Sequence, residues 1–297
     1  MNAESVKARL KNLATKEGGT IQDKLVTYAL ERSIYRLSVS KYVDRFTLKG
    51  GIFLYALFDK QFVRATMDID LVAQKMPNDI EEIKKVFQDI FSIEYDDALR
   101  YDLESLGVHN ITEFKEYHGV NVAINAYLDR TKIPVSIDIG FGDVVYPDRM
   151  QMEFPVLLDM DEPKIFAYSL YSVIAEKFEA FTSLGLINSR YKDFYDIYIL
   201  AKRFDLSGVD LQEAIRETFA HRGTAFDDIV AFEDEFTEDV VRQNRWKSFV
   251  KKKRAIEDVS FKDSIALVKD VLTPIVEAIQ SDSKFDMKWI CEDKQWK

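Results

Sequence analysis

The sequence predicts an α+β protein of two lobes, with a small mixed sheet in the N-terminal lobe and helices in the C-terminal lobe. Residues 120–141 alternate between apolar and polar side chains, as strands do, and a strand–helix unit precedes them. After about Tyr168 the apolar residues recur at helical spacing almost throughout. We place the boundary near residue 160, which gives lobes of residues 1–160 and 161–297, and we expect a cleft between them.

The N-terminal lobe is predicted to begin with helices over its first 40 residues. Thr20 and Asp23 have the spacing of a capping box, in which each side chain accepts a backbone N–H of the other residue. The elements expected next are a Gly-Gly turn with a short apolar helix (46–58), a strand (66–73) and a helix that begins at Pro77-Asn78-Asp79 and ends near Phe91.

Two strands and a hairpin turn are predicted to follow. Residues 120–128 place valine, isoleucine, alanine and leucine on one face and asparagine on the other, and residues 133–141 repeat the alternation. Residues 129–132 form the expected turn. Asp138 lies on the polar side of the second strand, so it faces either solvent or a cleft.

The C-terminal lobe is predicted to consist of helices. Apolar residues from Leu170 to Phe181 form one stripe, which Gly185 ends. Further helices are expected at about 191–203, 210–220, 238–254 and 262–280.

Composition restricts the classes of protein that the chain can belong to. Its net charge of −10 argues against coating of nucleic acid by bulk electrostatics, although Arg245 to Arg254 form one dense basic cluster. That cluster is either a solvated helix end or an RNA contact. The single cysteine excludes a disulfide within the chain, and there is no apolar run of about 18 residues. We therefore expect a cytoplasmic protein without a membrane span.

Asp68 and Asp70 are the first candidates for chemistry. On a strand, residues i and i+2 point to the same face, so the two carboxylates stand side by side while Ile69 enters the core. Two carboxylates about 5 Å apart repel each other by roughly 3 kcal/mol at an effective dielectric of 20. Mg²⁺ suits such a pair, because it combines a few carboxylates with water and phosphate oxygens. The alternative is a solvated strand end.

Gly50, Gly51 and Asp138 extend this candidate site. Glycine lets backbone amides approach a phosphate closely at the start of a helix, although the pair is also typical of a tight turn. If the strand of Asp138 lies beside that of Asp68 and Asp70, three carboxylates converge, as in two-metal phosphoryl transfer. Otherwise Asp138 is a solvated residue. Asp143 is expected to be a turn residue.

Other catalytic classes have no support in the sequence. The three histidines (His109, His118 and His221) lack metal-ligand spacing, and one cysteine cannot form a zinc knuckle. The chain has no G-x-S-x-G motif, no P-loop and no dinucleotide-binding G-x-G-x-x-G.

The segments around these residues resemble a known family. The segments are KGGIFLYALF, RATMDIDL, SIDIGFGD, AEKFEAFTS, RYKDFYDIYIL and, later, FAHRGTAF. Together they resemble the AbiEii/AbiGii toxins of bacterial abortive infection, within the DNA polymerase β-like nucleotidyltransferase superfamily. One departure is Ile52, where relatives commonly have serine or threonine after Gly-Gly. It puts a hydroxyl contact to phosphate in doubt, but not the backbone contact.

The resemblance implies a polymerase-β-like lobe, a reaction and a set of roles. It implies Mg²⁺-dependent (or Mn²⁺-dependent) transfer of a nucleoside monophosphate from an NTP to an acceptor hydroxyl, with release of pyrophosphate. Asp68, Asp70 and Asp138 would hold the metal ions, and Asp193 would be a catalytic acid or base. The nucleotide would be bound by Gly50, Gly51, Arg64, Lys177 and Lys192.

The residues alone leave simpler roles open for some of these positions. Lys177 flanks the apolar stripe of its helix and is otherwise a solvated lysine. Asp193 and Asp196 share one face near the start of a helix, where the helix dipole also favours acids. Arg64 either binds phosphate or pairs with a surface acid.

The family also suggests partners. The acceptor it suggests is RNA, with the 3′ end of tRNA as the candidate, and it implies a cognate antitoxin. Two alternatives remain at this point: nucleotidyl transfer to a protein or to a small molecule such as an antibiotic, and a non-catalytic nucleotide-binding module that acts through a partner.

Overall fold

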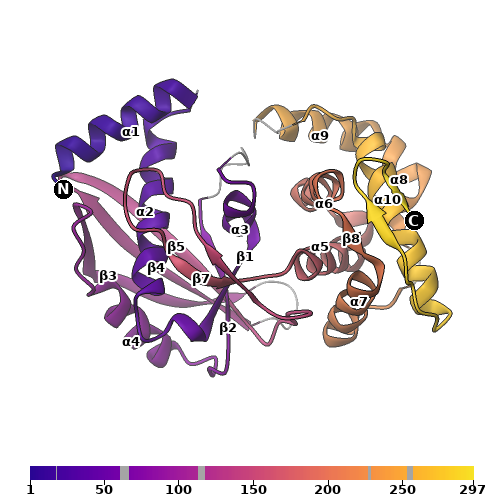
Figure 1. Ribbon diagram of the computed structural model, residues 1–297, viewed down its shortest axis with the longest axis horizontal. Coiled ribbons are helices and arrows are strands. Elements are labelled where there is room, and N and C mark those ends of the chain that lie inside the picture. The colour runs from indigo at the N-terminus through magenta and orange to yellow at the C-terminus, as the bar shows by residue number, and fades with distance from the viewer. Residues whose placement is uncertain (18, 61–66, 113–117, 227–228, 253–256) are drawn as a thin grey trace. The chain divides into compact units, whose positions relative to one another are not determined.

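A computed structural model describes residues 1–17, 19–60, 67–112, 118–226, 229–252 and 257–297. The chain forms two compact units, which are coloured along the chain in Figure 1. Unit 1 contains Met1–Gly142 and Met150–Ala167, and unit 2 contains Asp143–Arg149 and Tyr168–Lys297. Unit 1 has a mixed sheet with helices and unit 2 is largely helical, so the predicted α+β class is confirmed.

The sheet of unit 1 has seven strands in the order β3-β4-β5-β2-β1-β7-β6. Two neighbouring pairs, β2–β5 and β1–β7, are parallel, and the other pairs are antiparallel. The strands are β1 (Phe46–Lys49), β2 (Ile69–Ala73), β3 (Leu99–Thr112), β4 (His118–Leu128), β5 (Thr131–Phe141), β6 (Met150–Glu153) and β7 (Lys164–Ala167).

Alternation along β4 and β5 separates a core face from a polar face. The alternate apolar residues from Val120 to Leu128 and from Ile133 to Ile139 are almost completely buried, as predicted. The turn between the strands contains Asp129 with a positive φ of 53°. Side chains of odd and even positions point to opposite faces of a sheet, so Asp138 and Ser136 lie on the face opposite the buried isoleucines.

Helices cover the core face of this sheet. The helices of unit 1 are α1 (Ala3–Glu17), α2 (Ile21–Ser38), α3 (Gly50–Leu57) and α4 (Ile80–Phe91). α2 packs on β5 and β7, α4 packs on β3 and β4, and the two helices contact each other. The predicted capping box of Thr20 and Asp23 is present, and Asp79 caps α4.

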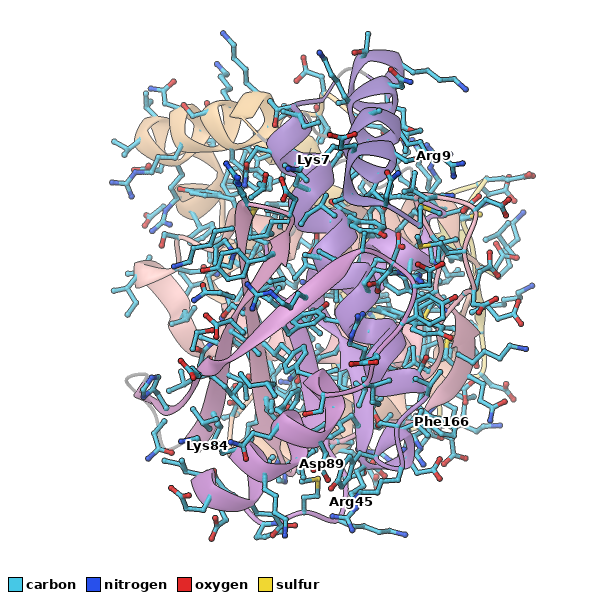
Figure 2. All side chains as sticks on the ribbon, turned by 90° about the vertical axis from the view of Figure 1, so that its left-hand side faces the viewer. Lys7, Arg9, Arg45, Lys84, Asp89 and Phe166 are labelled. Carbon is cyan, nitrogen blue, oxygen red and sulfur yellow. The ribbon has the colours of Figure 1, made fainter. Side chains whose placement is uncertain are left out.

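Charged side chains mark the two ends of unit 1. Lys7 and Arg9 extend from α1, whereas Arg45, Lys84 and Asp89 lie at the opposite end (Figure 2). There Asp89 accepts a hydrogen bond of 2.6 Å from the hydroxyl of Tyr42.

Inside unit 1, α2 carries a buried ion pair. The guanidinium of Arg36 donates to both carboxylate oxygens of Asp97, at 2.6 and 3.1 Å. Both side chains are at most 2% exposed.

Unit 2 is built from helices around an aromatic core. They are α5 (Leu170–Leu184), α6 (Tyr191–Arg203), α7 (Gly208–Arg222), α8 (Asp234–Glu238), α9 (Val240–Lys252) and α10 (Phe261–Gln280). The helix predicted at about 238–254 is confirmed as α9, whereas the short α8 before it was not predicted. Asp239 leaves the helical conformation with ψ 118°, and its side chain accepts the N–H of Arg242 at 2.7 Å, so a new helix begins there.

A small three-stranded sheet in unit 2 was not predicted. Its strands are β8 (Leu206–Ser207), β9 (Lys288–Ile290) and β10 (Gln295–Trp296), which are too short to show a period. Among the described residues, no helix is long and apolar enough to cross a membrane.

Candidate active site

Three carboxylates converge in unit 1. β2 and β5 are parallel neighbours, and their register places Asp138 directly opposite Asp70. Asp68 precedes β2 and lies with them, so that one oxygen from each carboxylate lies within 4.8 Å of the others. Ile69 between them is 1% exposed, as predicted. The predicted meeting of these acids is therefore confirmed.

Asn121 orients the carboxylate of Asp138 from β4, the neighbour of β5 on the side away from β2. It lies opposite Asp138 in the antiparallel pair of β4 and β5. Its amide nitrogen donates to Oδ1 of Asp138 at 2.6 Å and approaches Oγ of Ser136 at 2.8 Å. Sequence reasoning did not select Asn121, although its position on the polar face of a strand was predicted.

Gly50 is required where α3 meets the acidic strand. Its φ is +68°, which disfavours residues with a Cβ atom. Lys49, the residue before it, pairs with Asp70 in the antiparallel ladder of β1 and β2. Gly50 and Gly51 thus begin α3 beside the carboxylates, where backbone N–H groups and the helix dipole favour an anion. Ile52, the residue after Gly50-Gly51, is 2% exposed.

The donor set fits a hard divalent cation. All three groups are carboxylates, whose oxygens are the ligands that Mg²⁺ and Mn²⁺ prefer. All three side chains are only partly buried, which leaves access for water and phosphate oxygens. Mutual repulsion of the carboxylates would be offset by such a cation. Asp68, Asp70 and Asp138 are thus the residues that would hold the metal.

A second cluster of charges lies in unit 2. The ammonium of Lys177 on α5 contacts Asp193 at 3.1 Å and Asp196 at 2.6 Å. Both aspartates are buried, and Arg190 contacts Asp193 at 2.6 Å. Burial raises the pKa of Asp193, but the charges of Lys177 and Arg190 outweigh it and hold that pKa below the ordinary value. Asp193 is therefore ionised at neutral pH.

The comparisons with known proteins decide the family. The family model for the AbiEii nucleotidyl transferase toxin of type IV toxin–antitoxin systems matches residues 32–267. The chain belongs to the AbiEii family. This chain is therefore a member of a nucleotidyltransferase family and of a family of toxins.

Solved structures resemble this AbiEii member across most of its length. JHP933 from Helicobacter pylori is 12% identical, with a TM-score of 0.47, over 89% of this chain and 95% of that one. A candidate nucleotidyltransferase from H. pylori is 13% identical, with a TM-score of 0.46, over 86% and 96%. The search of curated proteins gives no match.

The AbiEii member also contains a cluster of three acids around one arginine, which sequence reasoning missed. Arg222 at the end of α7 contacts Glu176 and Glu179 on α5, each at 2.8 Å, and Asp143 at 3.2 Å. Burial lowers the pKa of Arg222, but the three acids raise it above its ordinary value. Asp143 is thus a buried ion-pair partner, and its prediction as a simple turn residue is wrong. The signal for Arg222 was its place in FAHRGTAF.

The other predicted site residues have these positions. Gly50, Gly51 and the three aspartates belong to unit 1, whereas Lys177, Lys192 and Asp193 belong to unit 2. Lys192 is exposed on the first turn of α6. Arg64 lies outside the described residues, as do residues 253 and 254 of the basic cluster.

Proposed function

We propose that this AbiEii member transfers a nucleoside monophosphate from an NTP to an acceptor hydroxyl and releases pyrophosphate. The convergence of Asp68, Asp70 and Asp138 within 4.8 Å carries this proposal. Mg²⁺ bound there would neutralise charge on the phosphate oxygens and lower the pKa of the attacking hydroxyl.

The residues of unit 1 prepare this site in two ways. Asn121 holds the carboxylate of Asp138 in one orientation, so that the third acid is positioned before substrate binds. Gly50 and Gly51 present backbone N–H groups at the start of α3, where they would donate hydrogen bonds to the triphosphate. Both contributions position charge in advance, which is the main contribution of a protein to phosphoryl transfer.

Lys177, Lys192 and Asp193 are proposed to act on the same reaction. Lys177 and Lys192 would bind the triphosphate as point charges, and Asp193 would accept or return a proton. The ion pairs of Lys177 with Asp193 and Asp196 support a charged lysine, and the lowered pKa of Asp193 supports a base over an acid.

The proposed acceptor is RNA, specifically the 3′ end of tRNA. Its support is the family, whose members are toxins of type IV systems, and the same family implies a cognate antitoxin. Modification of the tRNA end would stop translation, and growth arrest is the expected consequence.

The test is transfer of label from an α-³²P-labelled NTP. Wild type and Asp70→Asn are incubated with each of the four NTPs, Mg²⁺ or EDTA, and either total tRNA or whole-cell protein. We expect label on tRNA only with wild type and Mg²⁺. Label confined to protein would overturn the RNA acceptor, and no label in any mixture would overturn transfer to RNA or to protein. Growth arrest by a folded Asp70→Ala variant would instead support a non-catalytic module.

A further inference from the structure

One face of α9 in unit 2 is strongly basic. The helix contains five basic residues and no acidic residue, in a chain with a net charge of −10. Trp246 and Val250 point into the core, whereas Arg245, Lys247 and Lys251 are exposed. Helical spacing places these three cations on the side away from the core.

These three cations have no ion pair with any other residue that the structure describes. Three exposed cations near the C-terminus of the chain, Lys284, Lys288 and Lys297, each contact an aspartate. The basic face of α9 therefore presents positive charge that the described part of the protein does not neutralise.

The helix dipole explains only part of this pattern. Cations are favoured in the last turn of a helix, which accounts for Lys251. Arg245 lies near the middle of α9 and Lys247 lies before its last turn, where the dipole has little effect. A ligand of opposite charge accounts for all three positions.

α9 is held rigidly by its opposite face. The indole N–H of Trp246 donates to the carbonyl of Val259 at 2.7 Å, and its ring packs against those of Tyr195 and Phe261. A charged face on an anchored helix loses little conformational freedom when it binds a ligand.

The core-facing side of α9 also contacts the segment that leads into α6. Arg242 on α9 donates to the carbonyl oxygens of Asn188, at 2.9 Å, and Leu186. The ring of Trp246 contacts that of Tyr191, and the exposed Lys192 follows Tyr191 in the chain. Within unit 2, these contacts fix α9 against the segment that contains Lys192, which we propose to contact the substrate.

We propose that Arg245, Lys247 and Lys251 dock the phosphate backbone of the acceptor RNA. The three residues span about 9 Å along the helix, over which one nucleic-acid strand presents roughly three phosphates. This docking surface rests on the proposed function, because it identifies the acceptor as a polynucleotide that binds beyond its reacting end.

The test is direct binding of fluorescently labelled total tRNA between 50 and 200 mM salt. The triple variant Arg245→Gln, Lys247→Gln, Lys251→Gln is compared with the control triple variant Lys284→Gln, Lys288→Gln, Lys297→Gln, which loses the same charge. The logarithm of the binding constant falls with the logarithm of the salt concentration, with a slope of about 0.7 for each phosphate contact. Loss of three contacts should therefore reduce this slope by about 2 in the α9 variant. Its affinity for tRNA at 0.1 M salt should fall roughly 10- to 100-fold. We expect a change below about threefold for the control, because its cations already have partners.

Each outcome decides the docking surface. Equal losses of tRNA affinity in the two triple variants would overturn the docking surface. Unchanged affinity in the α9 variant would also overturn it and would favour an acidic protein as the ligand of this face. Absence of tRNA binding by wild type would also overturn it. The measurement needs no chemistry, so a wild type that binds tRNA through α9 but transfers no label would support the docking surface and refute the proposed transfer. Circular dichroism checks that both variants are folded.

Discussion

A Cβ atom added at Gly50 would lie 1.9 Å from Oδ2 of Asp70 and 2.4 Å from its Cγ. The first residue of α3 is therefore in direct contact with a carboxylate of the candidate metal site. The helix that would bind the triphosphate and the strand that would bind the metal share this contact, so that a change in one should disturb the other.

We predict that Gly50→Ala slows transfer by displacing Asp70. The positive φ alone should cost about 1–2 kcal/mol of stability, and a carboxylate displaced by about 1 Å should lower the rate roughly 100-fold. The matched control is Gly223→Ala, because Gly223 has a similar φ of 62° but nothing within 4 Å of an added Cβ. Equal activity of the two variants at equal thermal stability would contradict a role for the contact with Asp70.

Repulsion among the three carboxylates predicts how metal removal affects stability. Replacing Asp138 by asparagine keeps an acceptor for Asn121 but removes one charge from the cluster. After screening, that change should stabilise the metal-free protein by about 1 kcal/mol. It should also reduce the stabilisation by excess Mg²⁺, which for wild type is about 2.7 kcal/mol at 100 times the Kd.

Thermal unfolding in EDTA and in Mg²⁺ measures both effects of Asp138→Asn. Asp159→Asn, at an exposed residue of unit 1, is the control and should change neither value. A lower melting temperature of Asp138→Asn in EDTA would show that the carboxylates do not repel each other in the folded protein.

Glu31 on α2 predicts a pH dependence of the stability of unit 1. Burial raises the pKa of Glu31 to about 7, and the nearby Arg32 offsets only part of that effect. Between the unfolded pKa of 4.5 and about 7, the folded state binds more protons than the unfolded state, so stability falls as pH rises. The loss from pH 5 to pH 7.5 should be about 2 kcal/mol.

Equilibrium unfolding in urea at a series of pH values checks this loss. Far-UV circular dichroism is the signal for it, because all three tryptophans belong to unit 2. Glu31→Gln should remove the dependence, while Glu94→Gln at an exposed position should retain it. Stability that rises from pH 5 to pH 7.5 in wild type would contradict the raised pKa.

Local patterns predicted the strands that carry the site but not all of the sheet. β4 and β5 alternate without interruption, so their faces and the position of Asp138 could be read from the chain. β3 was missed because its pairing with β4 shifts register between Asp102 and Gly107, and such a bulge interrupts the period of two. Residues 99–103 alternate between apolar and polar side chains, but the alternation is short and stops at the bulge.

Contacts between residues distant in the chain could not be predicted from spacing. Arg36 and Asp97 are 61 residues apart, and Arg222 and Asp143 are 79 apart. Each looks like an ordinary surface charge until the fold brings the two partners together. That Asp138 joins Asp68 and Asp70 was predicted from the family pattern. The residues next to Asp138 in the chain give no such indication.

Asp193 and Asp196 form a matched pair that tests catalysis in unit 2. Both are buried on α6, and both contact the ammonium of Lys177. Replacing either by asparagine removes one of these two ion pairs of Lys177, so each variant should lose about 1–3 kcal/mol of stability. If Asp193 moves a proton, only Asp193→Asn should lose a further factor of at least about 100 in kcat.

Single-turnover transfer rates, compared at equal folded fractions, separate catalysis from positioning. The pH dependence of the transfer rate is compared between the two variants. If the rates of Asp193→Asn and Asp196→Asn fall equally as pH is lowered, Asp193 does not transfer a proton. Equal losses of rate in the two variants would show that both aspartates act through Lys177 alone, as positioning residues. A selective loss at Asp193 is the result we expect, because Arg190 contacts that carboxylate as well and helps to keep it ionised.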